Sequence, residues 1–321
     1  MVYIISQHIL PMQVYRNTDS LPDFHNAVVT IGTFDGVHSG HQQVITQMKQ
    51  EAARILGESV IITFDPHPRT VVDINSGIRL INTTEEKTEL LSGKGIDNLV
   101  IIPFTEKFAR LSAEDYISRF LVRYFHPHTI IIGYDHHFGK GRTGNYQLLN
   151  KMAGTYHYQL KEIPAHVLDS ISVSSTRVRE AISLGDMETA NTLLGYTYFF
   201  SGTVQEGNKL GRSIGFPTAN LQVADSFKLL PGDGVYAVDV ILEDEPERRF
   251  KAMMNIGYRP TVDGSRKVIE VNIFDFDRMI YGRTVKVFVR KFLRPEQRFS
   301  GLEELKAQLG EDRRQAEQIE N

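Results

Sequence analysis

The sequence predicts an α/β domain with a parallel sheet, followed by an all-β domain that forms a small antiparallel barrel with a terminal helix. Three observations lead to this prediction. The chain has 321 residues, which is the length of about two domains. Strand and helix patterns alternate over residues 27–162, as in a parallel sheet with helices on both faces. After about residue 185, strand patterns follow one another with Gly, Asp and Pro turns between them. We therefore expect the domains to be residues 1–184 and 185–321.

Short apolar, β-branched runs predict the strands of the first domain, and amphipathic stretches predict its helices. Strands are expected at residues 27–31, 60–64, 99–103, 129–132 and 156–160. One helix is expected directly after residue 41, and others at residues 84–91, 113–123 and 145–153. Two of these helices carry start signals, because Thr83 with Glu86 and Ser112 with Asp115 resemble capping boxes.

The second domain is predicted from runs of strand-forming residues. These runs cover residues 197–205, 235–242, 251–256, 268–274 and 284–292. A short helix at residues 180–184 precedes them. A last helix carries Leu302, Leu305 and Leu309 on one face, and Ser300 with Glu303 is expected to cap it. The last ten residues are polar, and we expect them to fray.

Composition excludes several classes of protein. The formal net charge is −3, which does not indicate a nucleic acid or an acidic membrane as partner. The chain has no cysteine, so disulfides, iron–sulfur clusters and thiol catalysis are excluded. No stretch approaches the ~20 apolar residues of a membrane span, and the apolar run at residues 2–5 lacks the features of a signal peptide. We therefore expect a cytoplasmic protein that acts on small molecules.

The most informative stretch is residues 32–41, Gly-Thr-Phe-Asp-Gly-Val-His-Ser-Gly-His, which connects a predicted strand to a predicted helix. Helix starts expose unpaired N–H groups, and glycines let a phosphate approach the backbone. His38 and His41 would add donors to phosphate oxygens, and His-x-Gly-His resembles the signature of the adenylyl- and cytidylyltransferase superfamily. Two alternatives are an ordinary turn with exposed histidines and a zinc pair, although zinc would need further ligands from elsewhere.

Two further loops follow predicted strands. Residues 65–68, Asp-Pro-His-Pro, present His67 at the end of the second strand. Residues 133–145 are rich in glycine and contain Lys140 and Arg142, which favours a flexible basic loop over phosphates. A formal G-x-G-x-x-G lies at residues 139–144, but six residues separate it from its strand, so we reject a dinucleotide site. Asn145 has helix capping as its alternative role.

A third anion site is expected at residues 173–179, Val-Ser-Ser-Thr-Arg-Val-Arg, before a helix. Hydroxyl groups at a helix start, followed by arginines, form a cradle for phosphates. The alternative is that Ser174 or Ser175 only caps the helix and the arginines are solvated.

The second domain carries one glycine-rich stretch, residues 202–221, which is not a Walker A sequence. Lys209 and Arg212 nevertheless suit a phosphate chain. Thr218 and Asn220 supply hard oxygens two residues apart, which suits a Mg²⁺–nucleotide. Glu270, expected to open a strand at residues 270–277, is a natural base for a substrate hydroxyl.

Over essentially its whole length, the chain resembles the bacterial bifunctional riboflavin kinase/FAD synthetases. The resemblance rests on G-T-F-D-G-V-H-x-G-H-Q, F-D-P-H-P, G-Y-D-x-x-F-G-K-G-R-x-G-N and S-S-T-R-V-R in the first domain. In the second domain it rests on G-R-x-x-G-F-P-T-A-N-L, D-G-V-Y, N-I-G-x-x-P-T, E-V-x-I-F-D-F-D and L-R-P-E-x-x-F. It implies a Rossmann-like nucleotidyltransferase domain followed by a riboflavin kinase-like barrel.

The resemblance also implies two reactions, riboflavin to FMN and FMN to FAD, with ATP as co-substrate of both and Mg²⁺ as cofactor. ADP and pyrophosphate would be the by-products, and a weak homo-oligomer stays open. The implied catalytic residues are His38, His41, Arg177 and Glu270. The implied binding residues are Gly32, Phe34, Asp35, Gly36, His67, Asp135, Lys140, Arg142, Asn145, Ser174, Ser175, Thr176, Gly207, Lys209, Gly211, Arg212, Gly215, Phe216, Pro217, Thr218 and Asn220, of which Thr218 and Asn220 would hold the metal.

Two residues depart from the family pattern. His136 stands where the family commonly has phenylalanine, and Asn272 where histidine is frequent. The first departure could alter stacking of a flavin or adenine ring. Two other functions stay open: a monofunctional adenylyltransferase, which would not keep Glu270, Thr218 and Asn220, and a non-catalytic flavin-binding regulator, which would tolerate loss of either histidine of the His-x-Gly-His signature.

Overall fold

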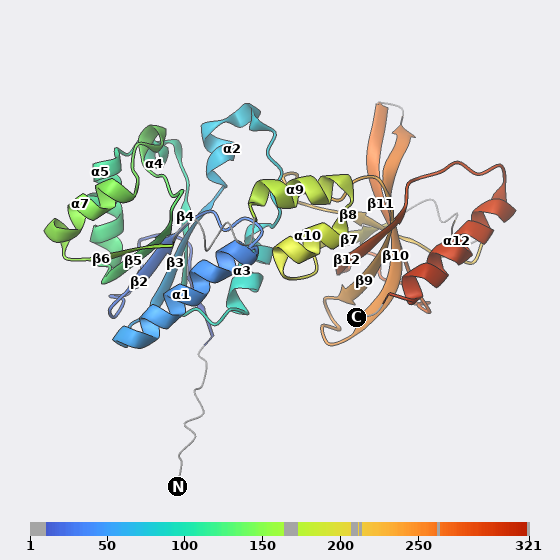
Figure 1. Cartoon of the computed structure of the whole chain (residues 1–321). Helices are drawn as coiled ribbons and strands as arrows, with labels where there is room; N and C mark the ends of the chain where they lie inside the picture. Colours follow the sequence, from blue (N-terminus) through green and yellow to red (C-terminus); the bar gives the residue numbers. More distant parts are fainter. Residues whose placement is uncertain (1–10, 164–172, 207–210, 212–213, 262–263, 320–321) are drawn as a thin grey trace, which may run out of the picture. The chain divides into compact units, whose positions relative to one another are not determined.

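The computed structural model describes residues 11–163, 173–206, 211, 214–261 and 264–319. The chain divides into two compact units. The first unit contains Met1–Ile78 and Thr84–Ser174, and the second contains Arg79–Thr83 and Ser175–Asn321. Figure 1 shows helices around a parallel sheet in the first unit and a barrel in the second, which confirms the predicted fold class.

A six-stranded parallel sheet forms the centre of the first unit. Its strands are β1 (Gln13–Tyr15), β2 (Val28–Ile31), β3 (Ser59–Asp65), β4 (Asn98–Pro103), β5 (Thr129–Gly133) and β6 (Gln159–Ile163). They lie in the order β1-β4-β3-β2-β5-β6, and every pairing is parallel. Because successive side chains of a strand point to opposite faces, Val29 and Ile31 belong to one buried cluster and Val28 to another. Apolar residues therefore fill both faces of the sheet.

Helices cover both faces of this sheet. They are α1 (Ser39–Ile55), α2 (Pro68–Val72), α3 (Thr84–Ser92), α4 (Glu106–Ala109), α5 (Ala113–Asp115), a π-helix (Tyr116–Val122), α6 (Arg123–Phe125) and α7 (Tyr146–Tyr156). The Oγ of Ser112 accepts a hydrogen bond of 3.0 Å from the backbone N–H of Asp115, so the predicted cap at this helix start is confirmed. The predicted strand at residues 156–160 begins too early, because α7 continues to Tyr156 and the left-handed backbone of His157 ends it.

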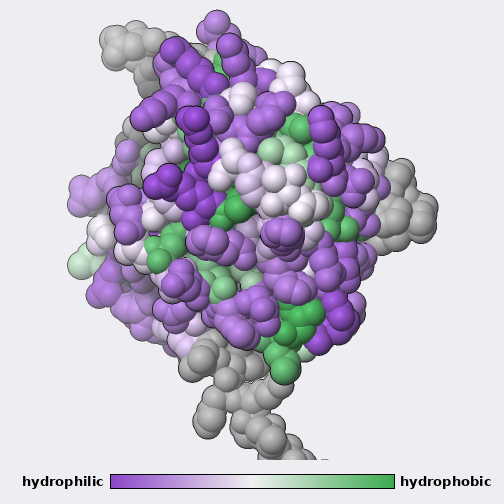
Figure 2. All heavy atoms as spheres, turned by 90° about the vertical axis from the view of Figure 1, so that its left-hand side faces the viewer, coloured by the Kyte–Doolittle hydropathy of each residue, from purple (hydrophilic) through white to green (hydrophobic). Residues whose placement is uncertain are grey.

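The edge strand β6 is protected by polar side chains. Buried and exposed residues do not alternate along this strand, and of its five residues only Ile163 is buried. Lys161 places its Nζ 2.6 Å from Oε2 of Glu51 on α1. Figure 2 shows that the face on this side of the molecule is mostly hydrophilic, with apolar residues in small separate areas. Charged side chains on an edge strand disfavour pairing with another chain.

The second unit is a closed antiparallel barrel. Its strands are β7 (Phe199–Gln205), β8 (Ala219–Gln222), β9 (Gly234–Leu242), β10 (Arg249–Thr261), β11 (Gly264–Ile273) and β12 (Thr284–Arg294), in the order β10-β11-β8-β7-β12-β9. Its helices are α9 (Ser175–Leu184), α10 (Met187–Leu194) and α12 (Leu302–Glu317). Both α9 and α10 belong to this compact unit, so the chain passes from the first unit to the second after Ser174. The division into functional domains between residues 184 and 185 stays a prediction.

Several expected boundaries in this unit are wrong. Strand β8 has only four residues and was not expected as a strand. Glu270 does not open its strand, since β11 begins at Gly264. The C-terminal helix starts after Gly301, which is its N-cap residue. Ser300 pairs with Glu304 instead of the predicted Glu303, since both its N–H and its hydroxyl donate to Glu304. It also continues to Glu317, so most of the last ten residues are helical rather than frayed.

The segment Arg79–Thr83 lies in the second unit although the chain on both sides of it lies in the first. Leu80 forms a parallel bridge with Lys228. The buried Nζ of Lys228 donates to the carbonyl oxygen of Ile81 at 2.6 Å and to that of Phe199 at 2.9 Å. Ile81 is fully buried. These five residues are therefore part of the second unit, although α3, which follows them directly, is part of the first.

Candidate active sites

The predicted strand–loop–helix arrangement at the histidines is confirmed. The loop after β2 leads directly into α1, and His38 is the N-cap residue of that helix. The Nδ1 atom of His38 accepts a hydrogen bond of 3.4 Å from the backbone N–H of His41. The two imidazole rings stack with centroids 3.7 Å apart, so both histidines face the same end of the helix.

The backbone of this loop is unusual. Phe34, Gly36 and Val37 all have positive φ angles, of 47°, 89° and 38°. Only glycine adopts such angles without strain, and a β-branched residue there is a marked exception. The buried side chains of Phe34 and Val37 belong to the core cluster under the loop. Packing of these two side chains therefore holds the loop in a conformation that the backbone alone would not favour.

His41 is held as a neutral imidazole. Burial lowers the pKa of His41 well below its usual value, and the nearby His38 and Lys87 lower it further. The Nδ1 atom of His41 is buried and has no hydrogen-bond partner within the described part of the chain. A buried polar atom of this kind fits a ligand that supplies the missing partner.

The loops after β3 and β5 lie at the same sheet edge as the histidine loop, because β2 pairs with both strands in parallel. His67 follows β3 and is nearly buried, and its Nδ1 accepts a hydrogen bond from the N–H of Arg69 as the N-cap of α2. Asp135 follows β5 and is exposed. The sequence therefore placed three loops at one edge correctly, although the contacts of their side chains with a ligand stay a prediction.

The basic loop after β5 is closed at its base. Phe138 and Gly144 exchange two backbone hydrogen bonds, of 3.1 and 2.9 Å. Lys140 and Arg142 lie at the tip and are exposed to solvent. Asn145 caps α7, since its Oδ1 accepts a hydrogen bond of 3.1 Å from the N–H of Leu148. Asn145 thus has a structural role, and its contact with a nucleotide stays a prediction.

The motif at residues 173–179 spans the division between the units. Ser174 belongs to the first unit, whereas Ser175, Thr176 and Arg177 form the first turn of α9 in the second unit. The helix begins five residues earlier than expected. Arg177 is exposed, and its catalytic role stays a prediction.

In the second unit, three polar residues lie in one row across the barrel wall. Glu270 of β11 is in register with Asn220 of β8 on one side and with Asn255 of β10 on the other. Residues that are directly opposite in a sheet point to the same face. The Oε2 atom of Glu270 accepts a hydrogen bond of 3.1 Å from Arg259. The same guanidinium lies 3.5 Å from Oε1 of Glu296, so it bridges two carboxylates.

The glycine-rich stretch before β8 is described only in part. Gly207, Lys209 and Arg212 lie outside the described residues. The N–H of Phe216 donates to the carbonyl oxygen of Gly211 at 2.8 Å, and a β-carbon on Gly211 would lie 2.2 Å from the carbonyl oxygen of Phe216. Only glycine fits this close turn, which Gly215 with φ 86° completes.

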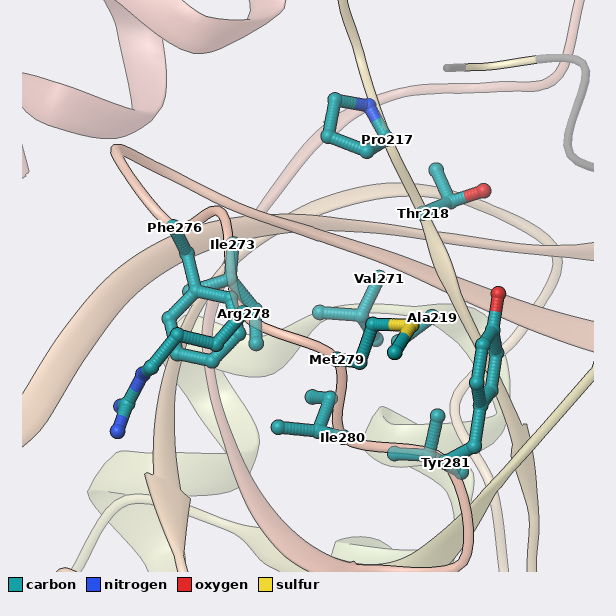
Figure 3. A pocket seen from close by; sticks show the side chains of 11 residues that line it. Pro217, Thr218, Ala219, Val271, Ile273, Phe276, Arg278, Met279, Ile280 and Tyr281 are labelled. Atoms are coloured by element: carbon teal, nitrogen blue, oxygen red, sulfur yellow. The ribbon is translucent and has the colours of Figure 1, made fainter.

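Phe216 packs on the cluster beneath α12, whereas Pro217 and Thr218 are exposed. The structure thus assigns Phe216 to packing, and its contact with a ligand stays a prediction. Figure 3 shows a pocket beside Thr218 that is lined by both apolar and polar side chains. Ala219 and Val271 line it from the barrel, and the side chains of Met279 and Ile280, from the loop before β12, close in on them.

Comparisons with known proteins identify both halves of the chain. A family model described as FAD synthetase matches residues 21–177, and one described as riboflavin kinase matches residues 194–320. A bifunctional riboflavin kinase/FMN adenylyltransferase of Listeria monocytogenes is 39% identical over 297 residues, which is 92% of each chain. The protein of the same description from Escherichia coli K12 is 36% identical and covers 89% of this chain and 90% of that one.

The chain belongs to the bifunctional riboflavin kinase/FMN adenylyltransferase family. A crystal structure from Streptococcus pneumoniae, described as a macrolide-efflux protein, shares the fold with a TM-score of 0.85 and 29% identity over 97% of this chain and 100% of that one. The efflux description applies to that protein. Within the residues that the structure describes here, no helix is long and apolar enough to span a membrane.

The two departures from the family pattern have structural explanations. The ring of His136 stacks on Phe138 with centroids 5.7 Å apart, and burial, with smaller contributions from His137 and Arg142, lowers the pKa of His136 to about 4. A neutral imidazole therefore packs as an aromatic ring there, as phenylalanine would. Asn272 is buried, and its Nδ2 donates to the carbonyl oxygen of Pro217 at 2.7 Å, next to Thr218.

The geometry points to two residues that the sequence motifs did not single out. Lys87 is buried near the histidine loop, and Arg259 contacts Glu270. Lys87 lies in Thr-Glu-Glu-Lys, which has the composition of a solvated helix face. No sequence signal would have selected it. Arg259 lies on β10, and only the register of β10 with β11 brings it close to the carboxylate.

Proposed function

We propose that the first unit carries out FMN adenylyl transfer and the second unit carries out riboflavin phosphorylation. The supporting observation is that each family match falls on a different set of candidate residues, the histidine loop in one case and the row of Asn220 and Glu270 in the other. In the kinase reaction, the terminal phosphoryl group of ATP passes to the 5′-hydroxyl of riboflavin and ADP leaves. In the second reaction, the FMN phosphate attacks the α-phosphorus of another ATP, and pyrophosphate leaves.

Adenylyl transfer needs positioning and charge stabilisation more than a base. The attacking phosphate is already ionised at neutral pH, so no proton has to be removed from it. The N-terminus of α1 carries the positive end of the helix dipole, and neutral His41 offers one N–H donor to the phosphate oxygens. His38 adds a further proposed phosphate contact. The catalytic role expected for Arg177, which lies on α9 of the second unit, stays a prediction. The nucleotide-binding roles of the remaining loop residues belong to the same proposal.

Phosphorylation of riboflavin does need a base, and Glu270 is the proposed one. A carboxylate within hydrogen-bond reach of the 5′-hydroxyl can accept its proton as the phosphoryl group arrives. Arg259 donates to Oε2 of Glu270 and so orients the carboxylate. The pocket beside Thr218 is the proposed place for the ring of one of the two substrates.

Mg²⁺ is the proposed metal of the kinase reaction. The hydroxyl of Thr218 and the side-chain oxygen of Asn220 are hard donors of the kind that Mg²⁺ prefers, and neither residue is buried. When bound, the ion would neutralise phosphate charge. The glycine-rich stretch with Lys209 and Arg212 would bind the same phosphates. The family matches support flavins and nucleotides as the partners, and a cytoplasmic location belongs to the same proposal.

The test is a product assay on wild type, two variants and one control variant. Wild type with riboflavin, ATP and Mg²⁺ should form FMN first and then FAD. A variant with His38→Ala and His41→Ala should form FMN and stop there. Glu270→Gln should form FAD only when FMN is supplied, and Glu303→Gln on the exposed face of α12 serves as its matched control. Loss of both activities in a folded single-site variant would contradict the division between units.

A further inference from the structure

A buried lysine lies beneath the histidine loop and has no part in the mechanism above. Lys87 is on α3, and its side chain is only 5% exposed. Its Nζ donates a hydrogen bond of 3.4 Å to Oγ1 of Thr63 on β3. That hydroxyl in turn donates to the carbonyl oxygen of Thr33 at 3.1 Å. Lys87 is therefore linked, through one hydroxyl, to the backbone of the loop that leads to His38.

Two carboxylates oppose the effect of burial on the ammonium group of Lys87. Asp35 of the same loop and Asp65 at the end of β3 both raise the pKa of Lys87, against the larger opposite effect of burial. Asp35 is itself 1% exposed. A buried ammonium without anions nearby is strongly unfavourable, so these carboxylates and Lys87 depend on one another. Removing the ammonium would leave Asp35 as a buried carboxylate with one cation fewer.

Lys87 also influences His41 electrostatically. The charged or titratable groups that influence His41 are His38 on the same helix and Lys87 on α3, and both lower its pKa. Burial is the largest cause of the lowered pKa of His41, and His38 and Lys87 add to it. The buried Nδ1 of His41 has no hydrogen-bond partner among the described residues. Loss of the lysine charge would make protonation of His41 easier.

We propose that Lys87 is a positioning residue for adenylyl transfer, whose buried ammonium holds Asp35 and the Thr63–Thr33 contact and so fixes the histidine loop for the phosphates of ATP. The inference rests on the assignment of adenylyl transfer to the first unit. Lys87 acts through the loop, because its side chain is buried beneath it. The residue has no proposed role in riboflavin phosphorylation.

The experiment compares full-length wild type with Lys87→Gln, Lys87→Arg and Lys151→Met. Lys87→Gln keeps a donor for Thr63 but removes the charge, and Lys87→Arg keeps the charge. Lys151 is an exposed lysine on α7 of the same unit and serves as the matched control. FAD formation from FMN and ATP is measured over a range of pH, with separate values of kcat and KM. Riboflavin phosphorylation is measured in the same preparations.

For Lys87→Gln we expect a loss of about 100-fold in kcat for FAD formation, as for a misplaced reacting group, with riboflavin phosphorylation unchanged. The acidic limb of its pH profile should move to higher pH, because His41 becomes easier to protonate. Lys87→Arg should recover part of the rate and the wild-type acidic limb, and Lys151→Met should match wild type.

Wild-type rates in Lys87→Gln would overturn the inference. An unshifted pH profile with equal losses in Lys87→Gln and Lys87→Arg would also overturn it, because a packing role alone explains that result. The His38→Ala, His41→Ala double variant separates this failure from failure of the proposed function. If that double variant still makes FAD, the assignment of the first unit is wrong regardless of Lys87.

Discussion

Replacing Glu51 with glutamine should destabilise the first unit by about 3 kcal/mol at neutral pH, as the difference between two pKa values indicates. Glu51 lies on α1, and its side chain is 5% exposed. Its carboxylate accepts hydrogen bonds of 2.9 and 2.7 Å from Arg54 and one of 2.6 Å from Lys161 on β6. The contacts with Arg54, followed by those with Lys161, lower the pKa of Glu51 from 4.5 to about 2, against the opposing effect of burial.

The sign of the pH dependence follows from that lowered pKa. The ionised carboxylate stabilises the folded chain, so its contribution is fully present above pH 4.5 and is lost as the pH falls towards 2. About 1 kcal/mol of it should be gone at pH 4. The difference in stability between wild type and Glu51→Gln should therefore shrink between pH 7 and pH 4.

Differential scanning calorimetry at both pH values measures this difference, and loss of FAD formation after heating identifies the transition of the first unit. Glu106→Gln is the matched control, since Glu106 pairs with Arg110 at 3.0 Å while both side chains are 74% exposed. Its effect should stay within about 0.5 kcal/mol. An effect of Glu51→Gln that is equally small, or that does not change with pH, would refute the reasoning.

Three further substitutions test packing and buried polar contacts. Gly144→Ala should destabilise the loop after β5 and slow FAD formation, because its β-carbon would lie 2.4 Å from the Phe138 ring; thermal unfolding and the FAD assay measure this. Asp312→Asn should lower the melting temperature of the barrel by weakening the 2.7 and 2.8 Å contacts with Arg294, at a cost of about 3 kcal/mol. Lys228→Met should cost about 2 kcal/mol in urea unfolding, since two buried carbonyl oxygens lose their donor.

The strands at the centre of the first unit could be predicted from the sequence, because each is a short apolar run that can be recognised without its neighbours. The β-branched runs at β2, β3 and β5 are buried on both faces, which a short continuous apolar run indicates directly. The loops that follow them gather at one edge because the strands are parallel. The position of His38 at the start of α1 followed from its motif, whereas the predicted position of Glu270 at the start of a strand was wrong.

Other features depend on contacts that lie far apart in the sequence. Strand β8 contains Ala219 and Asn220, which do not favour strands, and forms because β7 and β11 pair with it on both sides. Lys87 lies on a helix whose sequence is polar, and only the fold buries it. No local sequence pattern indicates that residues Arg79–Thr83 belong to the barrel unit.

The position of Arg79–Thr83 in the second unit has a consequence for folding during synthesis, because the rest of that unit is made much later. Ile81 hydrogen-bonds to Lys228, which follows it by 147 residues. At ribosomal speed, roughly 7 to 30 s pass before that partner is made. During this time the carbonyl oxygen of Ile81 lacks the hydrogen bond from Lys228. A chain that ends before Lys228 therefore leaves the early segment of the second unit, Arg79–Thr83, without this partner.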